Sequence, residues 1–464
     1  MPSSPKSEQT AKHGVRHAPG ALLSKLALLG GTPVRTREFA VRVTMGAAEK
    51  AAAMRVLDAD SLSEFVGAPG EYFNGGKEVR GFEELWCRMF GVRHGVAMNS
   101  LTTGLQAALG AIGIEPGNEV ICPPYTMSAT ATAVLFYGGI PVFADVDPIR
   151  FTIDPACIEA QITGRTRAIM AVHLFGYPAD MDAIMAIARK RNLKVIEDAA
   201  QAPGVLYRGR PVGGIGHIGG FSLNYHKQIH SGEGGLMVTD DDSLALRMRL
   251  IRNHGENVTE AHKLEDISNL IGSNYRYTEL QAAIATEQLK RLKALIAHRM
   301  ELAAALDSRL GGIPGLGIQN REAGSTHAYY MYPIRFDENA IGIRRTLFMR
   351  AVNAELPKPK YWNTTPLYLE GYVRPLYLNP IYQRKIALGR RGFPFNANPG
   401  VTYEYPKGLC PVAERLHEKE LLLCPLLQEA ISVADINDFA DAVAKVIAQK
   451  KQLMNLKTEE AVPS

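Results

Sequence analysis

Short apolar segments separated by helical patterns occupy the chain from about residue 94 to residue 239. Within each segment the apolar residues do not alternate with polar ones, which is typical of strands buried on both faces. Such strands form a mostly parallel sheet covered by helices, and ligands bind at the carboxyl ends of its strands. The segments are HGVAM (94–98), NEVICP (118–123), IPVFADV (140–146), AIMAVHLFG (168–176), LKVIED (193–198) and GGLMVT (234–239).

Helical patterns flank this region on both sides. Apolar residues recur at helical spacing over residues 46–58 and 80–90, over a long stretch from Thr278 to Leu310, and again near residues 434–450. This period places one apolar face of each helix against a core. The whole pattern predicts an α/β protein with a mostly parallel sheet flanked by helices.

The character of the sequence changes near residue 300, where we predict a domain boundary. We expect a large domain over residues 26–300, which includes an N-terminal helical segment, and a smaller C-terminal α+β domain over residues 301–464. Residues 1–25 carry basic groups but no apolar core of a signal peptide, and we expect a disordered leader there. Residues 356–405 are rich in Pro and aromatic residues, and our hypothesis is that they line or cover a substrate channel.

Composition narrows the class of protein. Of the 464 residues, 46% are hydrophobic and 21% charged, which is ordinary for a globular protein with a large core. A net charge of +5 is small for this length, and we expect no nucleic-acid partner. The five cysteines show neither paired nor zinc-binding spacing, and no stretch is apolar enough to span a membrane. We therefore expect reduced thiols, no membrane association and a cytoplasmic location.

Two charged side chains follow the predicted strands at positions where a ligand would bind. Asp198 ends the apolar strand LKVIED, and Gln201 lies one helical turn beyond it. Lys227 lies in the glycine-rich stretch FSLNYHKQIHSGEGG, 29 residues after Asp198 and five after Ser222. A single loop lysine is usually a surface residue, but a lysine, a carboxylate and hydroxyl donors in this order suit pyridoxal 5'-phosphate (PLP). The lysine would hold the cofactor covalently and the carboxylate would pair with its ring nitrogen.

Two further candidates follow the first two strands. Ser100, Leu101 and Thr102 come after HGVAM and enter a helix, where hydroxyl groups and backbone amides can bind a phosphate. Taken alone, this pattern is more often an ordinary helix cap. Tyr125, in CPPYTMSATAT, is a candidate for stacking on the cofactor ring, although a single aromatic residue in a loop is common.

Other motifs have simpler explanations. Gly214-x-Gly216-x-x-Gly219 matches the dinucleotide-binding pattern, but it precedes a strand-like run instead of opening a helix. His226 and His230 have the spacing of metal ligands on a helix, but the glycines around them disfavour a helix and no third ligand stands out. We expect neither a nicotinamide cofactor nor a metal.

From about residue 26 to residue 450 the chain resembles the DegT/DnrJ/EryC1/StrS family, the sugar aminotransferases of the aspartate-aminotransferase fold type I. The resemblance implies that fold for the large domain. It is carried by ordered segments along the chain: LLGGTPVR (28–35), EPGNEVICPPYT (115–126), PVFADVDP (141–148), VHLFGYPADMDAI (172–184), VIEDAAQAPG (195–204), GGFSLNYHK (219–227), SGEGGLMVT (231–239), IRNHGE (251–256), SNYRYTELQAAI (273–284) and CPVAERL (410–416).

The resemblance implies a role for each candidate near the cofactor ring. Lys227 would form the Schiff base with PLP and then move the proton during transfer. Asp198 would pair with the pyridinium nitrogen, Gln201 would contact the ring oxygen O3′, and Tyr125 would stack on the ring.

The resemblance also implies how the phosphate is held. Ser222 and Thr102, with the amides around Ser100 and Leu101, would bind it. Asn274 would reach the phosphate of the neighbouring subunit's cofactor, which requires a homodimer. Leu101 replaces a glycine that family members usually carry. Either the backbone at Leu101 is ordinary helix, or the phosphate lies in a slightly different position from that in other family members.

The implied activity is transfer of an amino group from L-glutamate or L-glutamine to a keto sugar or a cyclitol. Among keto sugars, the resemblance favours one that is linked to a nucleotide. Two other interpretations remain open. A dehydratase branch of the family carries a histidine in place of the lysine, and His226 is adjacent to Lys227. A regulatory protein could also keep the fold without turnover.

Overall fold

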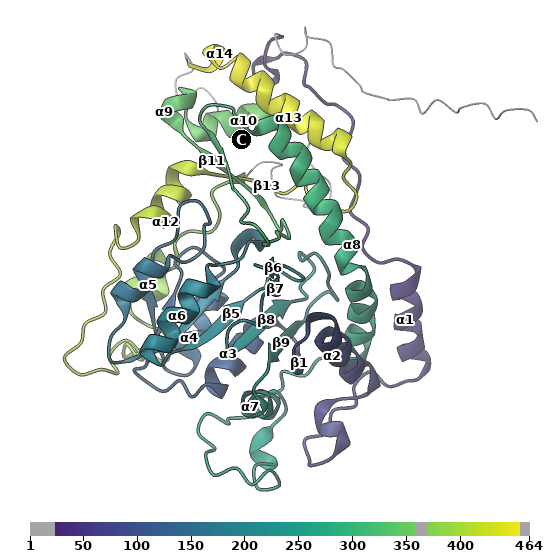
Figure 1. Cartoon of the computed structure of the whole chain (residues 1–464), viewed down its shortest axis with the longest axis vertical. Coiled ribbons are helices and arrows are strands. Elements are labelled where there is room, and N and C mark those ends of the chain that lie inside the picture. Colours follow the sequence, from purple (N-terminus) through teal and green to yellow (C-terminus); the bar gives the residue numbers. More distant parts are fainter. Residues whose placement is uncertain (1–23, 358–368, 455–464) are drawn as a thin grey trace, which may run out of the picture.

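A seven-stranded sheet forms the centre of the larger part of the molecule in the computed structural model, which describes residues 24–357 and 369–454 (Figure 1). The strand order is β1-β9-β8-β5-β4-β2-β3, and β9 runs antiparallel to both its neighbours. The pairs β2–β3, β2–β4, β4–β5 and β5–β8 are parallel, which confirms the predicted mostly parallel sheet. The strands are β1 (His94–Met98), β2 (Glu119–Cys122), β3 (Ile140–Phe143), β4 (Thr166–Val172), β5 (Lys194–Asp198), β8 (Ile218–Ser222) and β9 (Gly235–Thr239).

Helices cover both faces of this sheet, as continuous apolar strands require. One hydrophobic cluster contains side chains of α3, α4 and α7, and a second contains side chains of α2, α5, α6 and α8. The short strands β6 (Leu206–Tyr207) and β7 (Arg210–Pro211) form a separate hairpin. The helices are α1 (Ala47–Asp58), α2 (Lys77–Phe90), α3 (Leu101–Ala111), α4 (Ala129–Phe136), α5 (Pro155–Gln161), α6 (Met181–Arg191), α7 (Asp242–Arg252) and α8 (Glu279–Leu310).

The C-terminal part is built on an antiparallel sheet of order β10-β11-β13-β12. A third hydrophobic cluster joins this sheet to α10, α13 and the second half of α8, together with Leu26 and Phe39 from the beginning of the described chain. Its elements are β10 (Leu316–Ile318), β11 (Tyr332–Phe336), α9 (Glu338–Ile341), α10 (Arg345–Ala354), β12 (Leu369–Glu370), α11 (Pro380–Gln383), α12 (Pro411–Arg415), β13 (Leu421–Cys424), α13 (Val433–Ala448) and α14 (Lys451–Met454).

Helix α8 connects the two parts, and Figure 1 shows it running from one to the other. It packs against α1 and α2 in the larger part and against α13 in the smaller one. The boundary predicted near residue 300 falls inside this uninterrupted helix. The division into 26–300 and 301–464 therefore stays a prediction.

The segment rich in Pro and aromatic residues is described only in part, because residues 358–368 lie outside the described residues, as do residues 1–23 of the predicted leader. Three of its tyrosines, Tyr377, Tyr382 and Tyr405, pack around Phe143 of β3. The Tyr405 hydroxyl donates to the Pro141 carbonyl at 2.9 Å. This half of the segment thus covers the edge of the sheet. Within 24–357 and 369–454, no helix has the length and apolar character needed to cross a bilayer.

Candidate active site

Asp198 lies at the carboxyl end of β5, where its side chain is buried. Its carboxylate accepts hydrogen bonds from the Thr130 hydroxyl at 3.0 Å and from the Ala200 backbone N–H at 3.1 Å. Burial raises the pKa of Asp198, although these hydrogen bonds and the charge of Lys227 act to lower it. A buried carboxylate costs free energy unless a cation or several donors compensate its charge, so this position suits a cationic partner.

Lys227 lies in the loop between β8 and β9. Its Nζ is 4.3 Å from the centre of the Tyr330 ring, within the range of a cation–π interaction. Burial lowers the pKa of Lys227 to about 8, and the negative charge of Asp198 opposes this fall. A larger fraction of this amine is therefore neutral near pH 7 than in an ordinary lysine, which makes it a better nucleophile.

A chain of hydrogen bonds joins Tyr125 to Gln201. The Tyr372 backbone N–H donates to the Tyr125 hydroxyl at 2.7 Å, and Gln201 Nε2 donates to the Tyr372 hydroxyl at 3.1 Å. Gln201 Oε1 accepts from the Phe175 backbone N–H at 2.6 Å. Phe175 has a φ of 59°, an unfavourable conformation for a bulky residue. The loops that follow β2, β4 and β5 are thus joined by hydrogen bonds to one another and to Tyr372 of the Pro- and aromatic-rich segment.

The beginning of α3 has ordinary helical geometry. Ser100 is the N-cap, and its hydroxyl accepts from the Thr103 backbone N–H at 3.1 Å. Leu101 is the first helical residue, so the first of the two alternatives for this position holds. Its side chain points into the core, because a Cβ built on Gly220 of β8 would lie 2.4 Å from Leu101 Cδ1. Thr102 is exposed at the same helix end.

Ser222 reaches this helix end from the other side of β9. Gly235, the first residue of β9, pairs with Met98 of β1 and with Ser222 of β8. A Cβ on Gly235 would lie 2.5 Å from the Leu101 backbone nitrogen, so only a glycine allows β9 to approach α3 this closely. Ser222 and Ser100 therefore flank the same glycine at the carboxyl ends of β8 and β1.

Asn274 lies on the surface beside the residue that precedes this helix. Its carbonyl accepts from Asn99 Nδ2 at 3.4 Å, and its own side chain is exposed and accepts from the Arg276 backbone N–H at 3.4 Å. The contacts of Asn274 within one chain are thus with neighbouring loops. The role expected for it in a partner's site stays a prediction.

The glycine-rich turn at 213–219 binds a group of the protein itself. The backbone N–H groups of Gly213, Ile215 and Gly216 donate to the Glu197 carboxylate at 2.7, 2.7 and 2.5 Å. A turn whose amides converge in this way can bind an anion. Here that anion is an internal carboxylate, which is the physical reason why the motif differs from a dinucleotide site.

Three residues at the site were missed in the sequence: Thr130, Tyr330 and Tyr372. Thr130 lies within CPPYTMSATAT, and nothing in that segment of the sequence indicated its hydrogen bond to Asp198. Tyr330 was one of several aromatic residues in AYYMYP. Tyr372 belongs to the segment expected at the substrate channel, which was a general signal but did not single it out.

Known proteins match the chain over most of its length. Residues 61–394 match the DegT/DnrJ/EryC1/StrS aminotransferase family. GDP-perosamine synthase of Caulobacter vibrioides is 40% identical over 269 residues, which are 57% of this chain and 70% of that protein. The L-glutamine:2-deoxy-scyllo-inosose aminotransferase of Streptoalloteichus tenebrarius is 34% identical over 444 residues, covering 92% of this chain and 99% of that protein.

The fold agrees with these matches. A crystal structure of an aminotransferase from Psychrobacter cryohalolentis is similar with a TM-score of 0.75 at 30% identity, over 89% of this chain and 99% of the other. Sequence and structure therefore agree over both parts of the molecule. The chain belongs to the DegT/DnrJ/EryC1/StrS aminotransferase family and is an aminotransferase of fold type I.

Proposed function

We propose that the protein binds PLP through Lys227 and transfers an amino group from L-glutamine or L-glutamate to the keto group of a sugar or cyclitol. One observation carries this proposal: Lys227 lies over the Tyr330 ring and interacts electrostatically with Asp198, a buried carboxylate at the end of β5. The names of two relatives support the substrate class, since one acts on an inosose with L-glutamine and the other makes a GDP-linked amino sugar.

The residues at the site fit PLP. A protonated ring nitrogen would supply the cation that the buried Asp198 carboxylate needs. The phosphate would bind at the beginning of α3, to Ser100, Thr102 and the first helical amides, with Ser222 on the other side of Gly235. Tyr125 would stack on the ring. Gln201 would contact its O3′ atom with a side chain already oriented by Tyr372.

The chain itself would move the protons of the reaction. When bound, PLP supplies an aldehyde that takes up the amino group and a ring that withdraws electrons from the adjacent carbon. Lys227 Nζ would accept the proton from the donor's α-carbon and later return one. An amine with a pKa of about 8 suits both steps near neutral pH. Asp198 would pair with the ring nitrogen and favour its protonated form.

The alternative dehydratase chemistry would need a histidine at the position of the lysine. The structure supports Lys227 at that position, because its Nζ faces the Tyr330 ring while the His226 ring packs against Tyr225 with 3.7 Å between ring centres. The adjacent His226 is thus oriented toward a surface tyrosine. This arrangement favours transamination.

We extend the proposal to a cytoplasmic homodimer in which Asn274 of one chain reaches the phosphate of its partner's cofactor. Its exposure beside the beginning of α3 supports a contact with a second chain. All five cysteines are free thiols, which suits a reducing compartment. The mass in solution of the wild type and of Asn274→Ala, with PLP affinity measured on both, tests this part. A monomer that binds PLP normally would contradict it.

The activity is tested by the visible absorbance of the protein loaded with PLP, before and after L-glutamine or L-glutamate is added. We expect an absorbance band that changes with a donor and is lost in Lys227→Ala. The matched control is Lys290→Ala, which removes a lysine on the exposed face of α8 and should leave the band intact. No band in the wild type, or an unchanged band in Lys227→Ala, would refute the role of Lys227. Keto cyclitols and nucleotide-linked keto sugars are then compared as acceptors.

A further inference from the structure

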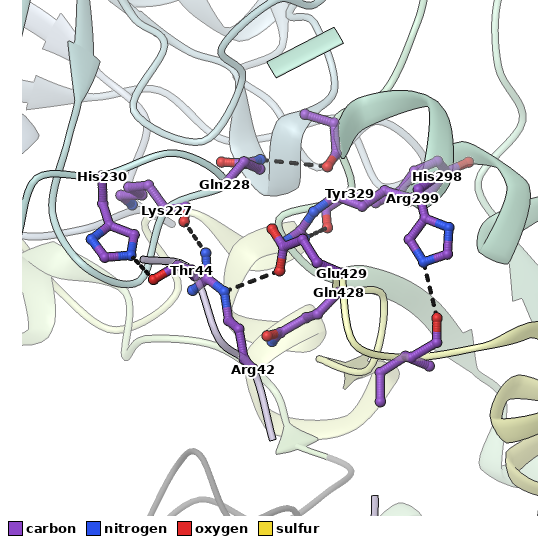
Figure 2. Close-up of polar contacts among 12 residues, drawn as sticks. Arg42, Thr44, Lys227, Gln228, His230, His298, Arg299, Tyr329, Gln428 and Glu429 are labelled. Carbon is purple, nitrogen blue, oxygen red and sulfur yellow. Dashed lines mark hydrogen bonds and ion pairs between the residues drawn. The ribbon is translucent and has the colours of Figure 1, made fainter. Parts of the chain in front are cut away.

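The backbone of Lys227 is held by an arginine from the segment that precedes α1. Arg42 donates from Nη2 to the Lys227 carbonyl at 2.6 Å (Figure 2). It also donates from Nη1 to the Tyr225 carbonyl at 3.2 Å. Only 8% of the Arg42 side chain is exposed. A buried guanidinium that binds two backbone carbonyls fixes the path of the loop from which the Lys227 side chain extends.

Glu429, just beyond β13 in the C-terminal part, compensates this charge. Its carboxylate accepts from Arg42 Nε at 3.1 Å and lies 3.6 Å from Nη2 of Arg299 on α8. Burial acts to raise the pKa of Glu429, but Arg299 and Arg42 together lower it below its ordinary value. One carboxylate thus joins two buried arginines, one from the segment before α1 and one from α8.

Arg299 completes the connection on the other side of the lysine. Its Nη1 donates to the Tyr329 carbonyl at 2.8 Å. Tyr329 has a φ of 43°, and the next residue is Tyr330, whose ring faces Lys227 Nζ. The contacts therefore form a closed circuit. They run from the Lys227 carbonyl through Arg42, Glu429 and Arg299 to the backbone of the residue before Tyr330, and from the Tyr330 ring back to the lysine.

Such an arrangement is costly, because each buried charge must lose its hydration. Residues 42 and 429 are 387 positions apart, so the circuit also depends on the N-terminal segment and the C-terminal part being docked together. We propose that Arg42, Glu429 and Arg299 form a clamp that positions the Lys227 amine against Tyr330. They would be positioning residues for the lysine. The inference rests on the proposed role of Lys227 as the cofactor lysine.

The clamp is tested on the full chain without PLP, through the pH dependence of the reaction of Lys227 with trinitrobenzenesulfonate, followed by mass mapping of its peptide. The titratable groups around the amine are Asp198, His226 and Tyr330. In the wild type we expect a half-maximal rate near pH 8. In Arg42→Gln the loop loosens and water reaches the amine, so the midpoint should rise by about one pH unit toward the value of an ordinary lysine.

Arg37→Gln is the matched control, because Arg37 lies on the same segment with a side chain that is 78% exposed. Its midpoint should equal that of the wild type. Arg42→Lys keeps the charge beside Glu429 and should give a smaller shift in the same direction. It replaces Arg42→Gln if that variant unfolds. A folded Arg42 variant with the wild-type midpoint would overturn the clamp.

The two proposals fail in different ways. A wild type that shows no PLP absorbance band refutes the role of Lys227 in the proposed function, whatever the labelling of the cofactor-free protein shows. A wild type that binds PLP through Lys227, combined with an unshifted midpoint in Arg42→Gln, refutes the clamp alone.

Discussion

Glu197 offers a sharp test of how the sheet supports the site, because the residue next to it is Asp198. Its side chain is fully buried, and each carboxylate oxygen accepts two hydrogen bonds. The donors are His173 Nε2 at 2.9 Å and the backbone N–H groups of Gly213, Ile215 and Gly216. His173 Nδ1 accepts from the Ala179 backbone N–H at 3.1 Å, so Nε2 carries the proton.

The substitution Glu197→Gln replaces one carboxylate oxygen with an NH₂ group that faces two donors. In either orientation of the amide, its NH₂ group faces the two donors that one carboxylate oxygen accepted from in the wild type. Those two hydrogen bonds are lost, and buried N–H groups then point at one another. Hydrogen bonds to a charged acceptor contribute about 1.5–3 kcal/mol each, so two of them amount to about 3–5 kcal/mol once partial relaxation is allowed for. We therefore expect Glu197→Gln to lower the free energy of unfolding by about 3–5 kcal/mol.

The measurement is guanidinium chloride unfolding of the cofactor-free protein, followed by circular dichroism. Glu159→Gln is the control, because Glu159 pairs with Lys190 on the exposed surface and should leave the unfolding midpoint unchanged. A Glu197→Gln protein within about 1 kcal/mol of the wild type would show that the turn is held by other contacts, and the reasoning would be wrong.

The same carboxylate also predicts a pH dependence. Burial acts to raise the pKa of Glu197, but the hydrogen bonds from His173 and the turn amides outweigh it and hold the pKa below its ordinary value of 4.5. A group with a lowered folded-state pKa stabilises the protein fully above its unfolded-state pKa, and this stability is lost as the pH falls below it. The difference in stability between wild type and Glu197→Gln should therefore shrink below pH 4.5. A constant difference down to pH 3 would contradict the assignment of the charge.

Three further substitutions have definite expected outcomes. Gly220→Ala places a methyl group 2.4 Å from Leu101 Cδ1 and should cost about 1–3 kcal/mol in thermal unfolding, so an unchanged midpoint would refute the packing of Leu101 of α3 against β8. Gly81→Ala, at an exposed position of α2 with open space around it, should instead gain about 0.5–1 kcal/mol, and a loss would contradict the open space. Asp198→Asn removes the charge that raises the pKa of Lys227, so the labelling midpoint of Lys227 should fall below about pH 8, and a rise would exclude the coupling.

Local patterns in the sequence predicted the sheet and grouped several of the candidate site residues. Apolar segments without alternation marked six of the seven strands of the large sheet, and β8 was visible only as a strand-like run because glycines interrupt it. Asp198, Ser222 and Lys227 follow strand ends, and parallel strands place their carboxyl ends at one edge of the sheet. Chain order alone therefore grouped these residues, and motif resemblance added their roles. The sequence shows that Leu101 replaces a glycine, but only the structure shows that Leu101 is the first residue of α3 and that its side chain packs against Gly220.

Only the tertiary structure decided which distant side chains meet. Arg42 and Glu429 lie near opposite ends of the chain, and neither carries a periodic signal that points to the other. Tyr330 and Tyr372 reach the site through the docking of the C-terminal part, which depends on the packing of α8 and not on any local propensity. The physical reason is that hydrophobic periodicity encodes which face of an element is buried, whereas register and docking angle decide which atoms come within hydrogen-bonding distance.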